Sequence, residues 1–247
     1  MFIMKTSFRY IVALSMLASI ASCKKDNYDS PSSQLSGRIV YQGEALGFEN
    51  YQVPFELYQP GYGGSAPIRS SFGQDGSLNA LLFDGEYKLV VPNGQGPFVW
   101  PKTNGNPDTI AISMKGGKAI DLEVTPYYMI RHQAITVSGT DIVADFGVEQ
   151  IITGVDGRNI GEVALFVNKT QFVSNAGDSK IIRKIDNVDV VSEQKLPGGA
   201  ITDPNAIHLV VPIPELEVHQ NYLFGRIGVR IDGVEDWLYG PVIKVTY

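Results

Sequence analysis

Residues 223–233 decide the fold class, and they read Leu223-Phe224-Gly225-Arg226-Ile227-Gly228-Val229-Arg230-Ile231-Asp232-Gly233. Successive side chains of a strand point to opposite faces, so the Leu, Ile and Val side chains at odd-numbered positions share one face and the two arginines lie on the other. Asp232-Gly233 is typical of a hairpin turn. The pattern predicts a strand with one buried face, followed by a last strand within residues 237–247. Gly240-Pro241 lies inside that last strand and predicts a bulge or an edge position there, because proline lacks a ladder donor.

The same alternation recurs along the chain. It appears within residues 35–41, 87–91, 120–124, 163–167 and 207–213. Turn pairs such as Asp75-Gly76 and Asp84-Gly85 lie between the runs, and no stretch after residue 23 keeps a helical period for three turns. The sequence therefore predicts an all-β chain of two consecutive β-sandwiches. We place them at residues 35–126 and 127–247, because Pro126 breaks the strand pattern between them.

The first residues have the organisation of an export signal. Lys5 and Arg9 precede an apolar run that ends at Ile20, too short to span a bilayer but suited to a signal peptide. Ile20-Ala21-Ser22-Cys23 resembles the lipobox of bacterial lipoproteins. We expect cleavage after residue 22, lipid attachment to Cys23, and a polar, flexible tether over residues 23–34. The alternative is an ordinary secretory signal with an incidental cysteine.

Composition excludes several classes of partner and cofactor. Cys23 is the only cysteine, so the chain has neither a disulfide framework nor a thiolate metal site. The 20 basic and 26 acidic side chains give a net charge of −6, and loss of the signal would remove two basic residues and no acidic ones. So acidic a chain is not expected to bind nucleic acid, and lipid, not a basic patch, would hold it on a membrane.

The first half of the chain contains a set of distinctive motifs: Leu35-Ser36-Gly37-Arg38-Ile39-Val40, Phe72-Gly73-Gln74-Asp75-Gly76-Ser77, Leu82-Phe83-Asp84-Gly85-Glu86-Tyr87-Lys88, Gly96-Pro97-Phe98 and Glu123-Val124-Thr125-Pro126-Tyr127. Together they resemble one family of Bacteroidota lipoproteins, the domain of unknown function 3823 family. The resemblance implies a transthyretin-like or carboxypeptidase-regulatory-like sandwich followed by an immunoglobulin-like or fibronectin III-like one. It also implies an accessory role beside outer-membrane transporters of the starch-utilisation type, and it brings no catalytic residues.

A search for chemistry finds no catalytic constellation. The three histidines are far apart, without the spacing of a metal site, and neither a Gly-x-Ser-x-Gly motif nor a phosphate-binding loop is present. We therefore predict neither an enzyme nor a metal or cofactor site, apart from the covalent lipid on Cys23. Asp108-Thr109-Ile110 resembles the O-glycosylation signal of exported Bacteroidota proteins, which makes Thr109 a candidate acceptor.

Aromatic residues are the remaining candidates for ligand binding, because an exposed ring can stack on the apolar face of a sugar. The candidates are Trp100, Phe98, Tyr62, Trp237 and Tyr239. Trp100 lies in a proline-rich loop and is the candidate we expect to be exposed, whereas Trp237 begins a strand and is better explained by packing. Core packing is the alternative for each of them.

The leading hypothesis is a non-catalytic lipoprotein that binds glycan or supports a glycan-uptake complex. We expect it on the outer membrane, facing the cell exterior and associated with an outer-membrane transporter complex. Asp26 and Asp29 loosely resemble a surface-export signal, and a merely solvated leader is the alternative. A structural or adhesive module that assembles cell-surface proteins is the other functional hypothesis.

Overall fold

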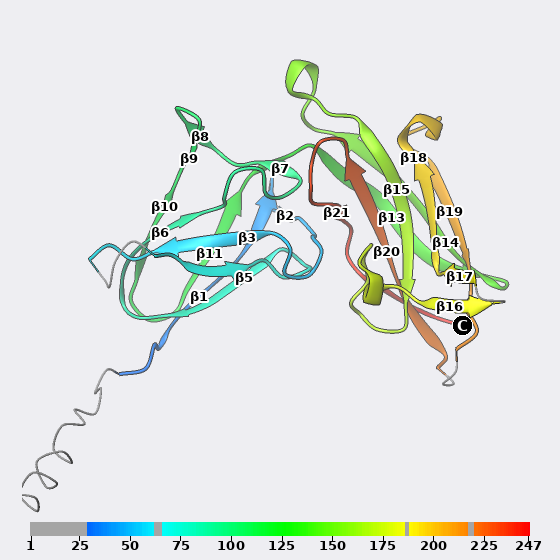
Figure 1. The fold of residues 1–247 in the computed structure, drawn as a ribbon, viewed down its shortest axis with the longest axis horizontal. Helices are drawn as coiled ribbons and strands as arrows, with labels where there is room; N and C mark the ends of the chain where they lie inside the picture. The colour runs from blue at the N-terminus through cyan, green and yellow to red at the C-terminus, as the bar shows by residue number, and fades with distance from the viewer. Residues whose placement is uncertain (1–28, 62–65, 186–187, 217–219) are drawn as a thin grey trace, which may run out of the picture. The chain divides into compact units, whose positions relative to one another are not determined.

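Strands make up nearly all regular structure of the protein. The computed structural model describes residues 29–61, 66–185, 188–216 and 220–247. Its helical segments within these ranges are single 3-10 turns at Gly154–Asp156, Gly177–Ser179 and Gly198–Ala200. None of the described residues belongs to a helix with the length and apolarity needed to cross a membrane. The predicted all-β fold of two consecutive sandwiches is confirmed (Figure 1).

The N-terminal sandwich packs a mixed sheet against an antiparallel one. In the first sheet β1 (Ser33–Tyr41) lies between β11 (Lys118–Glu123), which runs parallel to it, and β5 (Ser77–Leu82), with β2 (Glu44–Ala45) beside its end. The second sheet has the order β10 (Ile110–Met114), β6 (Gly85–Val90), β3 (Pro54–Tyr58) and β4 (Ile68–Ser71). Two short ribbons complete this part of the chain: β7 (Phe98–Val99) with β12 (Thr125–Pro126), and β8 (Lys102–Thr103) with β9 (Asn106–Pro107).

The core of this sandwich comes from the alternating positions of its strands. Leu35 and Ile39 of β1 are fully buried, as are Phe55 and Leu57 of β3. Gly37 lies between the two β1 residues, and a Cβ atom there would stand 1.6 Å from the carbonyl oxygen of Ile120. Glycine therefore permits the close approach of β1 to its parallel neighbour β11.

The C-terminal sandwich has a three-stranded and a larger sheet. The first has the order β13 (Tyr128–Ser138), β14 (Asp141–Gln150) and β19 (Ile207–Pro212). The second has the order β18 (Glu193–Pro197), β15 (Ile160–Asn168) and β20 (Tyr222–Ile231), and both β21 (Leu238–Tyr239) and β22 (Ile243–Thr246) pair with β20. A separate ribbon joins β16 (Ile182–Ile185) to β17 (Val188–Val191). The last predicted strand is thus interrupted between β21 and β22, where Gly240-Pro241 lies, as expected from the proline.

Strand β20 confirms the predicted alternation but not the prediction of a single buried face. Leu223, Ile227 and Val229 enter the sandwich core. On the opposite face Arg226 is also buried, with 1% of its surface exposed. Alternation with a period of two shows which residues share a face of the strand. It does not show whether another segment of the chain packs on the face that carries the arginines.

Backbone of the N-terminal sandwich packs on the arginine-bearing face of β20. The Arg226 guanidinium donates hydrogen bonds to the carbonyl oxygens of Phe48 (2.9 Å) and Gln74 (2.5 Å). It also donates to the carbonyls of Val173 (3.2 Å) and Gly240 (2.8 Å). One arginine therefore joins both sandwiches, which lie within the single compact unit of residues 32–247.

Candidate functional site

Trp100 was expected to be an exposed platform, and that expectation is wrong. Only 4% of its surface is exposed. Its indole nitrogen donates a hydrogen bond of 2.8 Å to the carbonyl oxygen of Asp108, and the Asp108 amide in turn donates to Pro101. The proline-rich loop therefore folds over the indole ring, because a buried N–H needs a partner and this loop supplies one.

The other described aromatic candidates are also buried. Phe98 packs against Phe48, with ring centroids 5.9 Å apart. Trp237 and Tyr239 stack on each other at 6.0 Å on the outer face of the β15–β20 sheet. The packing interpretation of Trp237 is confirmed. All four rings are largely buried; Trp100 lines the cleft described next, and both Trp100 and Phe98 line the smaller cavity beside it.

Beside Trp100 lies an open cleft of about 820 Å³. Its walls come from the β7–β8 region, from the segment just before β13 and from the loop after β14, and we refer to it as the cleft. Its main lining residues are Val99, Trp100, Lys102, Tyr127, Val155 and Arg158. A smaller cavity of about 160 Å³ shares most of them and extends towards Phe98 and Gly96.

Apolar side chains reach solvent in the cleft. Val155 is fully exposed in the 3-10 turn of residues 154–156, and Val99 is 42% exposed. Tyr127 is half-buried. An isolated exposed apolar residue needs no explanation, but three around one hollow form the kind of surface that ligand sites use.

Polar groups in the cleft complete the site. The Arg158 guanidinium lies 5.4 Å from the centre of the Tyr127 ring. Its Nη1 atom donates to the carbonyl of Asp232 at 3.4 Å, and no ion pair of Arg158 is found within the described ranges. Lys102 is exposed, and Asp156 contributes one carboxylate to the lining. The cleft therefore combines an aromatic ring with both donors and an acceptor.

Backbone contacts fix the walls of the cleft. Tyr127 donates its amide to Pro97 at 3.1 Å, and its carbonyl accepts the Ile151 amide at 2.9 Å. The Tyr128 hydroxyl donates to the Arg158 carbonyl at 2.7 Å. Hydrogen bonds at both ends of the 151–158 loop fix its position. A ligand would therefore lose less free energy to ordering of this loop when it binds.

Asp236 connects the loop of the smaller cavity to the C-terminal sandwich. Its carboxylate accepts the Gly96 amide at 2.7 Å. Burial raises the pKa of Asp236, the Gly96 amide lowers it, and the charge of Glu235 raises it further. Burial therefore disfavours the charged carboxylate, and the hydrogen bond from Gly96 offsets part of that cost while it fixes the loop.

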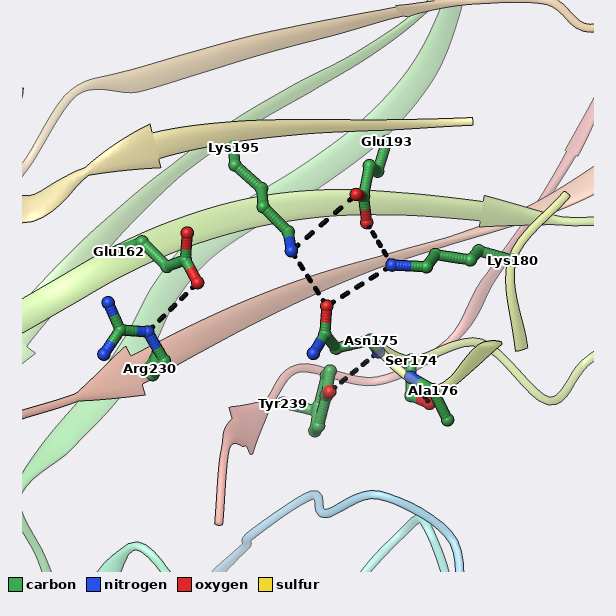
Figure 2. Close-up of polar contacts among 9 residues, drawn as sticks. All are labelled: Glu162, Ser174, Asn175, Ala176, Lys180, Glu193, Lys195, Arg230 and Tyr239. Carbon is green, nitrogen blue, oxygen red and sulfur yellow. Dashed lines mark hydrogen bonds and ion pairs between the residues drawn. The ribbon is translucent and has the colours of Figure 1, made fainter. Parts of the chain in front are cut away.

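A second group of residues lies on the outer face of the β15–β20 sheet, and we call it the lysine ring. Figure 2 shows Lys180 and Lys195 converging on both Asn175 and Glu193. Both lysine nitrogens lie over the Phe166 ring, 5.7 and 5.9 Å from its centre. Every cation of this group has a partner, so it is less suited than the cleft to an external ligand.

The remaining candidates from the sequence are placed as follows. Cys23 and Tyr62 lie outside the described residues. Thr109 is exposed between β9 and β10. No cluster of three or more potential metal ligands occurs within the described ranges.

Sequence reasoning missed the most useful cleft residues. The sequence patterns place Tyr127 at the domain boundary and in a family motif, and they single out neither Val155 nor Arg158. A signal was present in Gly154-Val155-Asp156-Gly157, where a lone apolar residue stands in a turn. Its partners lie far away in sequence, so only the fold brings them together.

Comparison with known families decides what kind of protein this is. Residues 33–125 match the model described as protein of unknown function (DUF3823) N-terminal domain. Residues 128–244 match the domain of unknown function DUF3823_C. The chain belongs to the DUF3823 family. The resemblance found in the sequence motifs is confirmed, and no curated protein matches the chain.

Solved structures of DUF3823 proteins share the fold. One from Parabacteroides merdae is 33% identical, with a TM-score of 0.71 over 88% of this chain and 100% of its own. One from Bacteroides ovatus is 28% identical, with a TM-score of 0.71 over 87% and 99%. A protein from Bacteroides uniformis, described as a candidate carbohydrate binding protein, is 18% identical, with a TM-score of 0.65 over 88% and 100%.

Proposed function

We propose that this DUF3823 protein is a non-catalytic lipoprotein that is anchored through lipid on Cys23 and binds glycan in the cleft. The observation that carries the binding proposal is a hollow of about 820 Å³ in which Tyr127, Val99 and Val155 face solvent beside charged groups. Its volume lies within the range of roughly 300–1,000 Å³ that is usual for small-ligand sites.

Sugar chemistry fits this combination of groups. A pyranose presents C–H bonds on its faces, which pack on apolar and aromatic surface, and hydroxyls at its edge, which need donors and acceptors. Tyr127 and the two valines supply the apolar surface. Lys102 and Arg158 supply donors, and Asp156 supplies an acceptor. The carbohydrate-binding description of the Bacteroides uniformis protein agrees with the proposal, but at 18% identity it supports only the shared fold.

Calorimetry with a broad panel of soluble glycans tests the binding proposal. We expect heat of binding for at least one of them and a loss of at least tenfold in affinity for Tyr127→Ala. Phe172→Ala is the matched control, because Phe172 is 47% exposed and does not line the cleft. No binding across the panel would reject the proposal, and so would equal affinity of the Tyr127 variant and the unmutated chain.

The anchor is tested separately. We propose outer-membrane attachment with the protein facing outward, and Cys23→Ala should abolish incorporation of labelled fatty acid and release the chain from membranes. Protease added to intact cells should degrade the unmutated protein. Recovery in a soluble fraction without label would reject the anchor and leave glycan binding to be judged by calorimetry.

Two further roles follow from the same proposal. A glycan-uptake role predicts that cross-linking on cells recovers an outer-membrane transporter. Recovery of a different surface protein in equal amounts would instead favour the structural or adhesive module. Thr109 remains a proposed O-glycosylation site, and its exposure is compatible with modification.

A further inference from the structure

The lysine ring places an amine, an amide and a carboxylate within reach of one another. Lys195 Nζ lies 2.9 Å from the side-chain oxygen of Asn175. Glu193 Oε1 lies 3.7 Å from the same lysine nitrogen. We propose that Lys195 and Asn175 form an intramolecular isopeptide bond, with Glu193 as the proton carrier. This proposal is independent of glycan binding.

The second lysine supplies the group that such a reaction needs at the amide oxygen. Lys180 Nζ lies 3.4 Å from the Asn175 oxygen and 2.8 Å from Glu193 Oε2. A cation at the amide oxygen polarises the carbonyl and stabilises the oxyanion that forms during attack. The two lysines therefore have different roles: Lys195 is the nucleophile, and Lys180 is the electrostatic partner.

Aromatic side chains and neighbouring strands restrict the positions of the reacting groups. The Phe166 ring is fully buried and lies under both lysine nitrogens, and the centre of the Trp237 ring lies 5.8 Å from Lys195 Nζ. The side chains of Lys180, Glu193 and Lys195 are 11%, 17% and 33% exposed, so all three are largely covered. Glu193, in contact with both lysine nitrogens, is the group placed to accept the proton that Lys195 must lose before attack.

The fold holds the amide in position before reaction. The Asn175 backbone N–H donates to the Tyr239 hydroxyl at 3.0 Å, and the Ser174 hydroxyl accepts the Ala176 amide at 3.1 Å (Figure 2). Lys195 stands on β18, directly paired with Ala164 of β15. Fixing both reactants in contact replaces an encounter in solution by a step within one structure, which is the main source of rate in such reactions.

The step balances without an oxidant or a cofactor. The Lys195 ammonium transfers a proton to Glu193, and the neutral amine attacks Cγ of Asn175, so that a C–N bond forms and the amide oxygen takes up negative charge. The bond between Cγ and Nδ2 then breaks, Glu193 returns its proton to the leaving nitrogen, and ammonia departs with the second proton of the attacking amine. A lysine ammonium and an asparagine amide become a secondary amide and an ammonium ion.

The bond would fasten the segment before β16 to β18. That segment contains Val173, which packs with Phe166, Trp237 and Tyr239. It also includes the carbonyl that accepts from Arg226. A covalent link from residue 175 to residue 195 would therefore hold the cover of the outer face in place, in the way a disulfide closes a loop, in a chain with a single cysteine.

Peptide mass spectrometry of the full chain tests the proposal. After protease digestion we expect a joined peptide pair that contains Asn175 and Lys195 and is lighter than the sum of its parts by one ammonia molecule. The pair should be absent from Lys195→Met and from Asn175→Ala, and its yield should fall strongly in Glu193→Gln. Lys244→Met is the matched control, since that lysine also lies over an aromatic ring, 3.9 Å from the centre of Tyr222, and the pair should persist.

Three results would overturn parts of this assignment or all of it. Complete recovery of separate peptides with an intact Asn175 and a free Lys195 from the folded, aged chain would reject the isopeptide bond. A pair joined through Lys180 would reject Lys195 as the nucleophile. Full yield in Glu193→Gln would reject the proton-carrier role. Circular dichroism of each variant confirms folding, so that an absent bond is not mistaken for an unfolded chain.

Discussion

Arg226 and Arg158 both lie over tyrosine rings, and they differ in burial and in hydrogen bonding. Arg226 lies 4.6 Å from the centre of the Tyr239 ring and is 1% exposed. Arg158 lies 5.4 Å from the centre of the Tyr127 ring and is exposed. Arg226 donates to four backbone carbonyls, whereas Arg158 has one long hydrogen bond through its guanidinium. The same pair of residue types therefore serves the fold in one place and leaves donors for a ligand in the other.

The difference teaches how to separate structural from functional cations in an acidic protein. Burial lowers the pKa of Arg226 to about 10, while the nearby Tyr239, Asp75 and Glu49 act in the opposite direction. A charge taken out of water at such a cost persists only where its surroundings satisfy it fully. Arg158 remains hydrated and keeps capacity for new hydrogen bonds, which a binding site needs.

Replacing Arg226 should have the largest effect. Arg226→Leu removes four hydrogen bonds and leaves buried carbonyls of both sandwiches without a donor. A buried acceptor left without its donor costs about 1–3 kcal/mol, so we expect the free energy of unfolding to fall by roughly 3–5 kcal/mol in all. Urea unfolding followed by tryptophan fluorescence measures this change.

Arg230→Leu is the control on the same face of β20. Arg230 is 41% exposed and pairs with Glu162 at 3.0 Å, and such surface pairs contribute about 0–1 kcal/mol. Equal destabilisation by the two substitutions would contradict the view that Arg226 joins the sandwiches. It would show instead that any arginine on this strand contributes similarly.

Replacing Arg158 should change binding and leave stability intact. Arg158→Gln keeps a polar side chain but removes the charge and the guanidinium donors. Hydrogen bonds from charged groups contribute about 1.5–3 kcal/mol, so we expect glycan affinity to fall roughly tenfold or more. Stability should change by less than about 0.5 kcal/mol, as for most exposed positions. Calorimetry on any glycan that binds measures the first quantity, and urea unfolding the second. A large loss of stability with unchanged affinity would assign Arg158 to the fold.

The sequence predicted strands well and burial on their outer faces poorly. Ile227 and Val229 lie where alternation placed them, because the sandwich core takes every second residue. Arg226 was placed on the polar face, and nothing in the sequence around it shows that Phe48 and Gln74, more than 150 residues earlier, would cover it. Long-range contacts of this kind are invisible to a local period.

The candidate site was only partly predictable for the same reason. The proline-rich segment around Trp100 forms no regular strand beyond the two-residue β7 and β8, and its folding back onto the indole depends on a hydrogen bond to Asp108 that composition does not reveal. The cleft combines Val99, Tyr127 and Arg158 from three separate parts of the chain. Sequence reasoning thus identified Trp100, a buried residue of the cleft wall, but missed Tyr127, Val155 and Arg158.

The two tyrosines allow a finer test of the comparison. The Tyr239 hydroxyl accepts the Asn175 amide at 3.0 Å and lies 3.5 Å from Glu49 Oε2. Tyr239→Phe should therefore cost about 1 kcal/mol in the free energy of unfolding, the usual contribution of a hydrogen bond. Tyr127→Phe keeps the ring in the cleft, and no hydrogen bond of the Tyr127 hydroxyl is found among the described residues, so stability should hardly change. A larger loss for Tyr127→Phe than for Tyr239→Phe would reverse the assignment of structural and functional rings.

The smallest expected effect concerns Glu49, which lies beside Tyr239 and Arg226. Burial raises the pKa of Glu49, hydrogen bonds from Ser174 and Tyr239 lower it, and the charge of Asp236 raises it. A carboxyl whose pKa is higher in the folded than in the unfolded chain binds more protons when folded, so acidification through the folded pKa favours folding at this group.

Glu49→Gln removes that titration. We therefore expect the free energy of unfolding of the unmutated chain to rise relative to the variant as pH falls from 7 towards 4.5, the ordinary pKa of a glutamate, and to level off below it. Urea unfolding of both chains over this pH range measures the difference, and a relative fall with acidification would show that Arg226 and the hydrogen bonds, not burial, dominate at Glu49.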